Sequence, residues 1–176
     1  MAQHLILLFS EAEIAATVQR LAQELDRDYR QRSPVLVGLL KGAFIFLADL
    51  IRHMHTPLRN VEFLRLSSYG DAMVSAGHAT VHMGLSPEAI ANQHVVMVED
   101  IVDTGMTTDT ALQYVQRYQP ASLRLCTLLD KPARRQVPVT IDYLGHTVPD
   151  RFIVGYGIDF AQQYRQLPAI YTLEDT

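Results

Sequence analysis

The first clear pattern in the sequence is helical. Ser10 and Glu13 have the spacing of a capping box, in which each side chain binds the backbone of the other residue. Apolar residues then recur three or four positions apart, at Ile14, Val18, Leu21 and Leu25. This spacing predicts an amphipathic helix from residue 11 to about 29, with one face packed against the rest of the protein.

The rest of the chain alternates short apolar runs with helical stretches. Four runs have the length of strands buried on both faces: 35–40, 61–66, 95–98 and 123–129. Helical stretches follow two of them, at 43–54 and 107–118, and shorter strand candidates lie at 139–145, 151–156 and 170–173. The alternation predicts an α/β fold, a mainly parallel twisted sheet with helices on both faces, in a single domain spanning 1–176.

Composition narrows the classes of protein. Apolar types make up 48% of residues and charged types 19%, which excludes a disordered chain. The net charge of −4 argues against nucleic acid as a partner, and no window approaches the roughly 18 apolar residues of a membrane span. The single cysteine, Cys126, lies in an apolar run and is expected to be a buried, inert thiol. We therefore expect a cytoplasmic protein in a reducing compartment.

The stretch 95–108 carries the most chemical information. A buried strand that runs through a loop into a helix places free backbone N–H groups and the positive end of the helix dipole at the carboxyl edge of the sheet, where phosphate binds. Gly105 allows a close approach of the backbone, and hydroxyl donors are supplied by Thr104, Thr107 and Thr108. Met106 occupies the place of a Walker lysine, so hydrolysis of a nucleoside triphosphate is disfavoured.

An acidic pair, Glu99 and Asp100, stands at the end of the same strand. Two carboxylates facing a phosphate would repel it unless they bind ribose hydroxyls or a divalent cation that prefers oxygen. The loop therefore favours a sugar phosphate together with Mg²⁺. The alternative is that Asp100 and Asp103 only cap the next helix. That would be the favoured explanation for a single acidic residue, but it accounts poorly for the whole stretch 95–108.

At this point the sequence resembles a known family. Residues 98–107, VEDIVDTGMT, resemble the phosphoribosyl diphosphate (PRPP) motif of type I phosphoribosyltransferases, and the chain as a whole is similar to their hypoxanthine-guanine members. Further matches follow in the family's order: LLKG at 39–42, LRLSSY at 64–69, LLDK at 128–131, FIVGYGID at 152–159, and Tyr164-Arg165. The resemblance implies the family's fold, including a small hood formed by terminal segments, and a purine phosphoribosyltransferase.

The resemblance also implies roles for the PRPP side of the site. The 5′-phosphate would lie on Asp103, Thr104, Gly105, Met106 and Thr107, with one side-chain contact missing because Met106 replaces a polar or basic residue. The pyrophosphate would meet Arg165 and the loop of Leu40, Lys41 and Gly42, where the family has a strained peptide. Mg²⁺ would be held by Glu99, Asp100 and Asp159, and Ser68 and Tyr69 would start a mobile catalytic loop.

On the base side, the resemblance gives Asp103 a proton exchange with purine N7 and makes Lys131 the ligand of a 6-oxopurine. Phe152 would stack on the base, while carbonyls near Ile153 or Asp159 would accept from a 2-amino group. From sequence alone, core packing of Phe152 and a surface salt bridge of Arg165 remain open. Hypoxanthine and guanine are both expected as substrates, and a homo-oligomer, dimer or tetramer, is expected.

Three features of the sequence have more than one interpretation. The stretch 67–79 is either a lid over a site or a plain insertion. The histidine sets 53/55 and 78/82 lack ligand partners at metal-binding spacing, so packed or solvated histidines are favoured. In place of an enzyme, the fold would also serve an RNA-binding regulator or a sugar-phosphate sensor, although the negative charge disfavours the first and Lys131, Phe152 and Asp159 disfavour the second.

Overall fold

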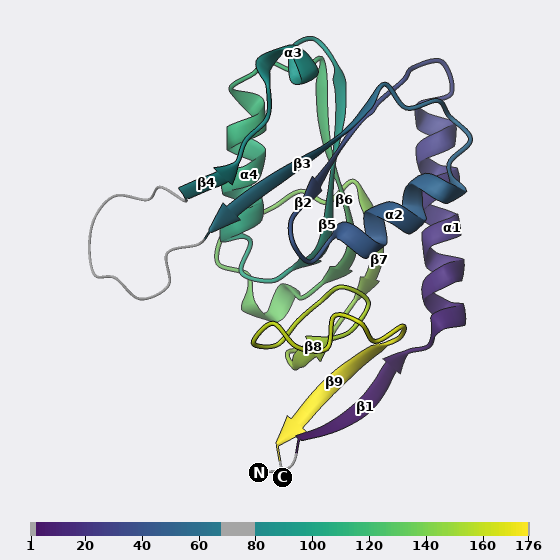
Figure 1. Ribbon diagram of the computed structural model, residues 1–176, viewed down its shortest axis with the longest axis vertical. Helices are drawn as coiled ribbons and strands as arrows, with labels where there is room; N and C mark the ends of the chain where they lie inside the picture. The colour runs from purple at the N-terminus through teal and green to yellow at the C-terminus, as the bar shows by residue number, and fades with distance from the viewer. Residues whose placement is uncertain (1–2, 68–79, 176) are drawn as a thin grey trace.

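The computed structural model describes residues 3–67 and 80–175 of the chain (Figure 1). Its main sheet has six strands in the order β4-β3-β2-β5-β6-β7. Their bounds are β2 Val35–Leu39, β3 Asn60–Ser67, β4 Thr80–Met83, β5 His94–Val102, β6 Ser122–Asp130 and β7 Tyr143–Thr147. All neighbours are parallel except β3 and β4, which confirms the predicted α/β fold with a mainly parallel sheet.

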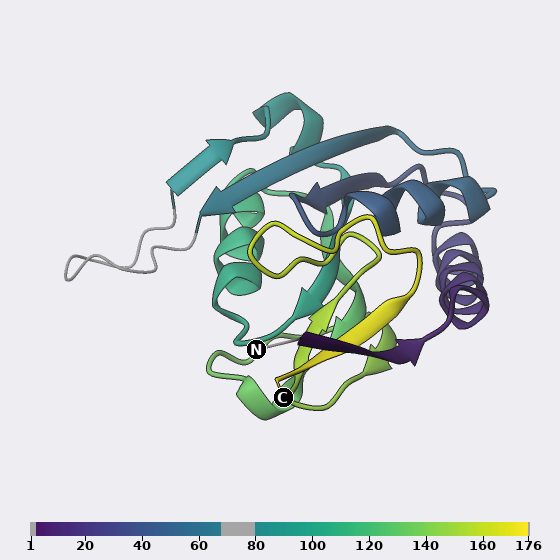
Figure 2. The same cartoon turned by 60° about the horizontal axis from the view of Figure 1, so that its bottom comes forward.

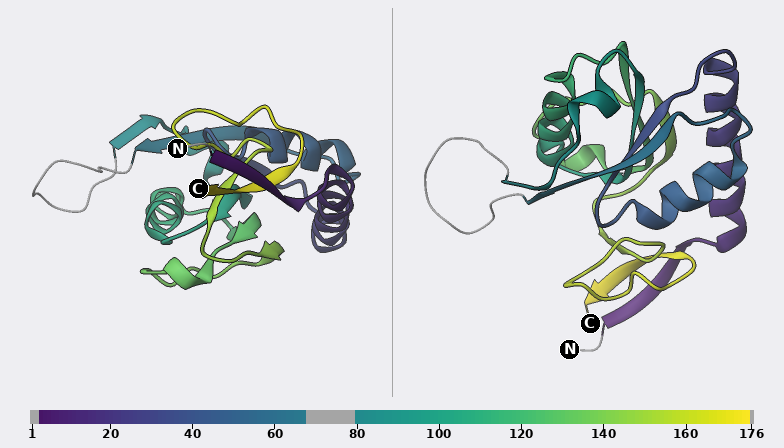
Figure 3. Two further views of the ribbon diagram at one scale, coloured as in Figure 1. Left: turned by 90° about the horizontal axis from the view of Figure 1, so that it is seen from below. Right: turned by 45° about the horizontal axis from the view of Figure 1, so that its top comes forward.

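Helices cover both faces of this sheet (Figure 3). One face carries α1 (Glu11–Asp28) and α2 (Phe44–His53), and the other carries α4 (Met106–Gln116), with a short α3 (Pro87–Ile90) and a 3-10 turn (Pro132–Arg134) at the ends of strands. The predicted capping box of α1 is present, since the Glu13 amide donates to Ser10 Oγ and Glu13 accepts from the Ser10 amide. None of these helices is long and apolar enough to cross a membrane.

The core is divided between the two faces of the sheet. Leu36 and Val96 pack toward α1 and α2, whereas their strand neighbours Val35 and Val95 pack toward α4. Because successive side chains of a strand point to opposite faces, a strand with helices on both sides must be apolar throughout. This explains why the central strands appear in the sequence as continuous apolar runs.

A second, three-stranded antiparallel sheet forms the predicted hood. It consists of β1 (Gln3–Phe9), β9 (Ile170–Asp175) and β8 (Phe152–Val154), in that order, and pairs Gln3 with Asp175. In Figure 1 it lies below the ends toward which the parallel strands point, and Figure 2 shows the turns between β8 and β9 in front of the main sheet. The hood therefore faces the carboxyl edge, where parallel α/β sheets bind ligands.

Several boundaries differ from the sequence-based expectations. The predicted polar loop 100–106 is wrong in its first part, because β5 continues to Val102, where it still pairs with Asp130 of β6. The strand expected at 139–145 begins at Tyr143, and the hydrophobic pattern did not predict β1, β4 or α3 as elements. Ser68 and Tyr69, with most of the expected loop 67–79, lie outside the described residues.

Candidate active site

The acidic pair at the end of β5 is the electrostatic centre of the site. Glu99 is 6% exposed and Asp100 is 9% exposed, and the Thr108 hydroxyl donates to Glu99 Oε2 over 3.4 Å. Burial raises the pKa of both carboxyls, and for Glu99 the negative charge of Asp100 raises the pKa further. Burial and mutual repulsion thus disfavour two negative charges at this position. A cation bound beside the pair would offset both effects and favour the ionised carboxylates.

The loop after β5 presents backbone rather than charge to a ligand. Gly105 is the N-cap of α4 with φ of 85° and has no side chain to cap the helix, while Thr104 Oγ1 accepts from the Met106 amide over 3.4 Å. Among the described residues neither Asp100 nor Asp103 accepts from an amide of α4, so the alternative that they serve as helix caps is wrong. A Cβ on Gly105 would lie 2.5 Å from the carbonyl oxygen of Val137, so the turn requires glycine on both grounds. Met106 begins the helix with an exposed side chain, and the first-turn amides have no acceptor inside the helix.

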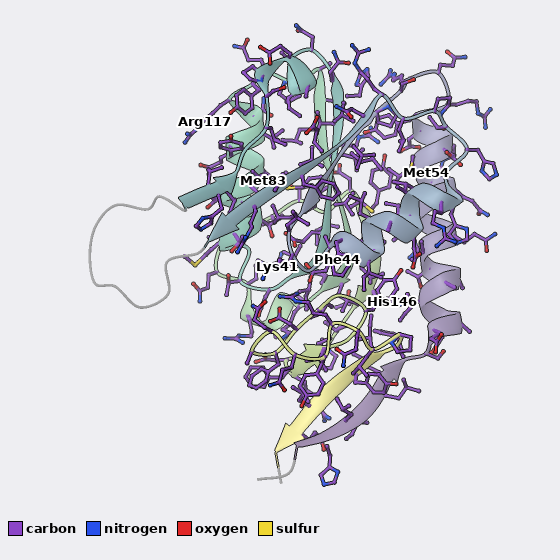
Figure 4. All side chains as sticks on the ribbon, in the orientation of Figure 1. Lys41, Phe44, Met54, Met83, Arg117 and His146 are labelled. Carbon is purple, nitrogen blue, oxygen red and sulfur yellow. The ribbon has the colours of Figure 1, made fainter. Side chains whose placement is uncertain are left out.

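Gly42 brings the loop 40–42, which is predicted to bind pyrophosphate and is called the pyrophosphate loop below, into direct contact with the acidic pair. A Cβ on Gly42 would overlap the carboxylate of Asp100, and a Cβ on Gly157 would overlap the carbonyl oxygen of Gly42. The Leu40–Lys41 peptide bond is cis, and Lys41 Nζ donates to Gln162 Oε1 of the turn between β8 and β9 over 3.0 Å. Figure 4 shows Lys41 and Phe44 beside this turn. Three segments that are far apart in sequence thus meet at one point.

Asp159 and Arg165, predicted for metal and pyrophosphate, form an ion pair with each other. Arg165 Nη2 lies 2.6 Å from Asp159 Oδ1, and Nη1 donates to the carbonyl of Gly157 over 2.7 Å. The other Asp159 oxygen accepts from the Gln162 amide. Arg165 does form a salt bridge, but a largely buried one that faces the Gly42 loop rather than an isolated surface pair.

Asp103 lies among cations on the other side of the site. Its Oδ2 is 3.9 Å from Lys131 Nζ and 3.7 Å from Arg134 Nη1, while its buried Oδ1 has no hydrogen-bond partner among the described residues. Lys131 is 4% exposed and donates to the carbonyl of Arg151 over 2.7 Å. Asp103 and Lys131, both expected on the base side of the site, thus lie side by side.

Sequence reasoning missed two arginines that follow Lys131. Arg134 contacts Asp103, and Arg135 donates to the carbonyls of Val102 and Asp103 and pairs with Asp130. Arg135 thereby fixes the backbone of the predicted phosphate loop. The sequence does contain a signal for these contacts: two adjacent arginines follow the end of a strand, and the neighbouring strand ends in an acidic loop.

Phe152 does not belong to the core. The residue is 56% exposed and its ring meets that of Phe160 edge to face, with centroids 5.5 Å apart, so core packing is the wrong alternative for Phe152. The neighbouring Ile153 does pack into the core, and it pairs with Thr172 of β9. Among residues 3–67 and 80–175, no three His, Cys, Asp or Glu side chains are grouped so that they could hold a metal ion.

These features define a class of protein: an α/β domain that binds a sugar phosphate at the carboxyl edge of its sheet, under a hood with an exposed aromatic ring. Comparison with known proteins gives the family. The profile described as "Phosphoribosyl transferase domain" matches residues 8–161. The chain belongs to the phosphoribosyltransferase family.

Three relatives indicate the branch of the family to which the chain is similar. The hypoxanthine phosphoribosyltransferase of Haemophilus influenzae is 40% identical over 167 residues, 93% of this chain and 92% of that protein. A hypoxanthine-guanine phosphoribosyltransferase structure from Bacillus anthracis superposes with a TM-score of 0.89 at 37% identity, covering 98% of this chain and 100% of that one. A Trypanosoma cruzi hypoxanthine phosphoribosyl transferase, studied for the role of its C-terminal region in oligomeric state and activity, gives 0.88 at 36% identity, covering 96% and 91%.

Proposed function

We propose that this protein transfers the 5-phosphoribosyl group of PRPP to hypoxanthine or guanine, forming IMP or GMP and pyrophosphate in purine salvage. The observation that carries the proposal is the meeting of Asp100, Gly42 and Gly157 at one edge of the sheet, with the Asp103–Lys131 pair beside it. This arrangement offers adjoining sites for a ribose phosphate, a pyrophosphate and a base. The similarity to purine phosphoribosyltransferases over nearly the whole chain supports it.

In this proposal the PRPP site is largely built from backbone. The 5′-phosphate binds to the loop 103–107 at the start of α4, and the pyrophosphate binds to the loop 40–42 and to Arg165. Ribosyl transfer builds positive charge on the sugar and negative charge on the leaving pyrophosphate. Donors that are fixed around the leaving group before the reaction therefore stabilise the transition state more than the ground state.

The acidic residues fit Mg²⁺. Glu99 and Asp100 would hold the ion or the ribose hydroxyls, and Asp159 would hold it directly or through water once Arg165 turns to the pyrophosphate. Two or three carboxylate oxygens are enough, because Mg²⁺ takes its remaining ligands from phosphate oxygens and water. When bound, the ion would neutralise charge that develops on the pyrophosphate.

On the base side, the proposal gives roles to Lys131, Phe152 and Asp103 and to the backbone near Ile153 or Asp159. Lys131 donates to the 6-oxo group, Phe152 stacks on the ring, and backbone carbonyls near Ile153 or Asp159 accept from the 2-amino group of guanine. Asp103 exchanges a proton with purine N7. The unpartnered Oδ1 of Asp103 supports that role, because a buried oxygen without a donor is free to bind a proton from a ligand.

The decisive experiment is a PRPP-dependent assay with hypoxanthine, guanine, xanthine, adenine and uracil in parallel, with Mg²⁺ and with excess EDTA. We expect turnover of the oxopurines in Mg²⁺ and its loss in EDTA. Failure on all five bases would contradict the proposal that the protein is an enzyme. The alternatives would then be the RNA-binding regulator and the sugar-phosphate sensor, neither of which the relatives favour. Full turnover in EDTA would contradict only the metal assignment.

We further propose that one domain spans the chain and that it works in the reducing cytoplasm, which its single, buried Cys126 supports. We also propose that it assembles with copies of itself through the exposed apolar face of Phe44 and Phe63. These rings line a hollow of about 350 Å³ with Leu40, Lys41 and Arg165, so a second copy seated there would cover the outside of the pyrophosphate loop.

Light scattering after size exclusion tests the assembly. Phe63→Glu should shift the protein toward the monomer, whereas Met83→Glu, which charges an exposed apolar position on β4, should not. Equal masses for both variants and the parent protein would contradict this interface.

A further inference from the structure

A tyrosine in the hood is tied to the helix that follows the pyrophosphate loop. The hydroxyl of Tyr156 donates to Asp49 Oδ2 over 2.6 Å, across 107 positions of sequence. Tyr156 is 7% exposed and lies between Phe152 and Asp159, whereas Asp49 lies on α2, which begins at Phe44. The bond therefore links the two segments between which the pyrophosphate would sit.

The backbone around Tyr156 is held in an unusual conformation. Gly155, Tyr156 and Gly157 have φ values of 98°, 51° and 96°, so a non-glycine residue occupies the left-handed region between two glycines. The amide of Tyr156 donates to the carbonyl of Leu167 over 2.8 Å, and the amide of Gly157 donates to that of Arg165 over 3.0 Å. The hydrogen bond of the Tyr156 side chain to Asp49, outside the turn, helps to hold this conformation.

The turn 155–157 contacts residues of the candidate site as well as residues of the core. The carbonyl of Gly157 accepts from Arg165, which pairs with Asp159, and the same glycine touches the carbonyl of Gly42. A change in the turn would therefore move Arg165 and Asp159 relative to the pyrophosphate loop. Phe152 would be less affected, because β8 is held by its pairing with β9.

The bond joins these segments at the far end of the turn from the Lys41–Gln162 hydrogen bond, and it adds to the contact of Gly157 with Gly42. Beside the pair lies a cavity of about 710 Å³ between α1, α2 and the hood, lined among others by Ile14, Ile45 and Leu167. The same carboxylate also meets Arg52, at 3.5 Å from its other oxygen. Burial raises the pKa of the Tyr156 hydroxyl, and its bond to Asp49 raises it further, so the hydroxyl stays protonated and continues to donate.

We infer that Tyr156 and Asp49 are a positioning pair, which holds the turn that carries Arg165 and Asp159 at its working distance from the pyrophosphate loop. The inference rests on the proposed function. It predicts an effect on PRPP that is separate from the effect on the base, because the bond fixes the pyrophosphate side of the hood.

Steady-state kinetics of Tyr156→Phe test the inference. We expect KM for PRPP to rise about tenfold, the factor that a hydrogen bond to a charged group is worth, while KM for hypoxanthine changes less than about twofold. Asp49→Ala should have the same effect, and adding it to Tyr156→Phe should cost little more. Asp49→Asn keeps an acceptor and should restore KM for PRPP to within about threefold of the parent value.

Tyr143→Phe is the matched control. Tyr143 is also buried and its hydroxyl also donates to an aspartate, Asp28 Oδ2, over 2.9 Å, but at the start of β7, away from the hood. This variant should lower the melting temperature and leave KM for PRPP unchanged.

Several results would overturn the inference: a Tyr156→Phe protein that melts lower but keeps the parent KM for PRPP, or equal rises in KM for both substrates. If Tyr156→Phe does not fold, the comparison of Asp49→Asn with Asp49→Ala decides, and equal KM values for PRPP would contradict the inference. An inactive parent protein would instead contradict the proposed function, so the two failures are distinguishable.

Discussion

The two oxygens of Asp103 have different surroundings, and this difference gives the residue its expected chemistry. Oδ2 faces the cations of Lys131 and Arg134, whereas Oδ1 is buried without a partner among the described residues. Asp103→Asn keeps the shape of the side chain but removes the proton exchange with N7. We expect kcat to fall about 10²- to 10⁴-fold with PRPP binding retained, measured by steady-state kinetics and by titration calorimetry.

A smaller loss would give Asp103 a different role. If kcat of Asp103→Asn falls less than about tenfold, the residue belongs to the phosphate loop and is not the proton-exchanging group. A loss of PRPP binding with unchanged kcat at saturation would lead to the same conclusion.

Lys131 is expected to decide which purine is accepted. Its ammonium has three donors and no acceptor, so it suits a 6-oxo group and opposes the 6-amino group of adenine. A site built on such a bond rejects a ligand that lacks it by up to about 10⁴ to 10⁵, so adenine should be a very poor substrate.

Lys131→Ala should therefore lose far more kcat/KM on hypoxanthine than on adenine, because only hypoxanthine forfeits a hydrogen bond. Both bases should be measured with both proteins, so that adenine controls for damage to the fold. Equal losses would mean that Lys131 does not read the 6-position.

At the scale of elements, the loop before α2 and the end of β5 must touch for the site to exist. Gly42→Ala would place a methyl group in the space of the Asp100 carboxylate and separate the two. We expect kcat/KM for PRPP to fall about 10²-fold, the cost of a misplacement near one ångström. Gly84→Ala is the control, since its added methyl meets the end of the Tyr114 side chain, away from the acidic pair. A Gly42→Ala protein with parent kinetics would show that the contact is dispensable.

The elements that could be predicted are those in which the order of apolar and polar residues shows which faces are buried. The periodicity after Ser10 gave α1, and the apolar runs gave β2, β5 and β6 because both faces of those strands are covered by helices. The end of β5 was mistaken for a loop because two carboxylates rarely occupy a buried strand. Local preference is expected to fail where a position serves binding rather than stability, which is the role proposed for this pair.

The site was predictable only as far as its residues lie in motifs. The PRPP loop, Lys131 and the segment 152–159 could be recognised from their local sequence. The contacts of Arg134 with Asp103 and of Tyr156 with Asp49 join distant segments, and no local pattern encodes such a pairing. The register that places Gly157 against Gly42 likewise follows from packing of the hood, which no single stretch of sequence contains.

For the molecule as a whole, the acidic pair links stability to pH. The pKa of Glu99 is raised in the folded state. Below the ordinary carboxyl range its side chain is protonated in both the folded and the unfolded state, so the group does not change the free energy of unfolding. As pH rises through the ordinary pKa toward the raised one, the unfolded state ionises more readily, and the ligand-free protein loses stability. Glu99→Gln should therefore raise the melting temperature at pH 8 and leave it nearly unchanged at pH 4.

Thermal melts across this range check the effect, with Glu88→Gln, an exposed position on α3, as the control. Mg²⁺ with pyrophosphate should stabilise the parent protein more than Glu99→Gln, because a bound ion offsets the buried charge only where the charge exists. A Glu99→Gln protein that melts lower at pH 8 would mean that the carboxylate contributes to stability as an anion.

The pairing of β1 with β9 has a consequence for how the protein is made. A ribosome releases β1 first, yet the register that joins Gln3 to Asp175 cannot form until nearly all the described chain has been translated. The parallel sheet with its phosphate loop depends on earlier segments and can be completed sooner. The nascent protein should thus form its proposed phosphate loop and Lys131 before the hood that carries Phe152, so that the surface proposed to stack on the base is the last part of the site to be completed.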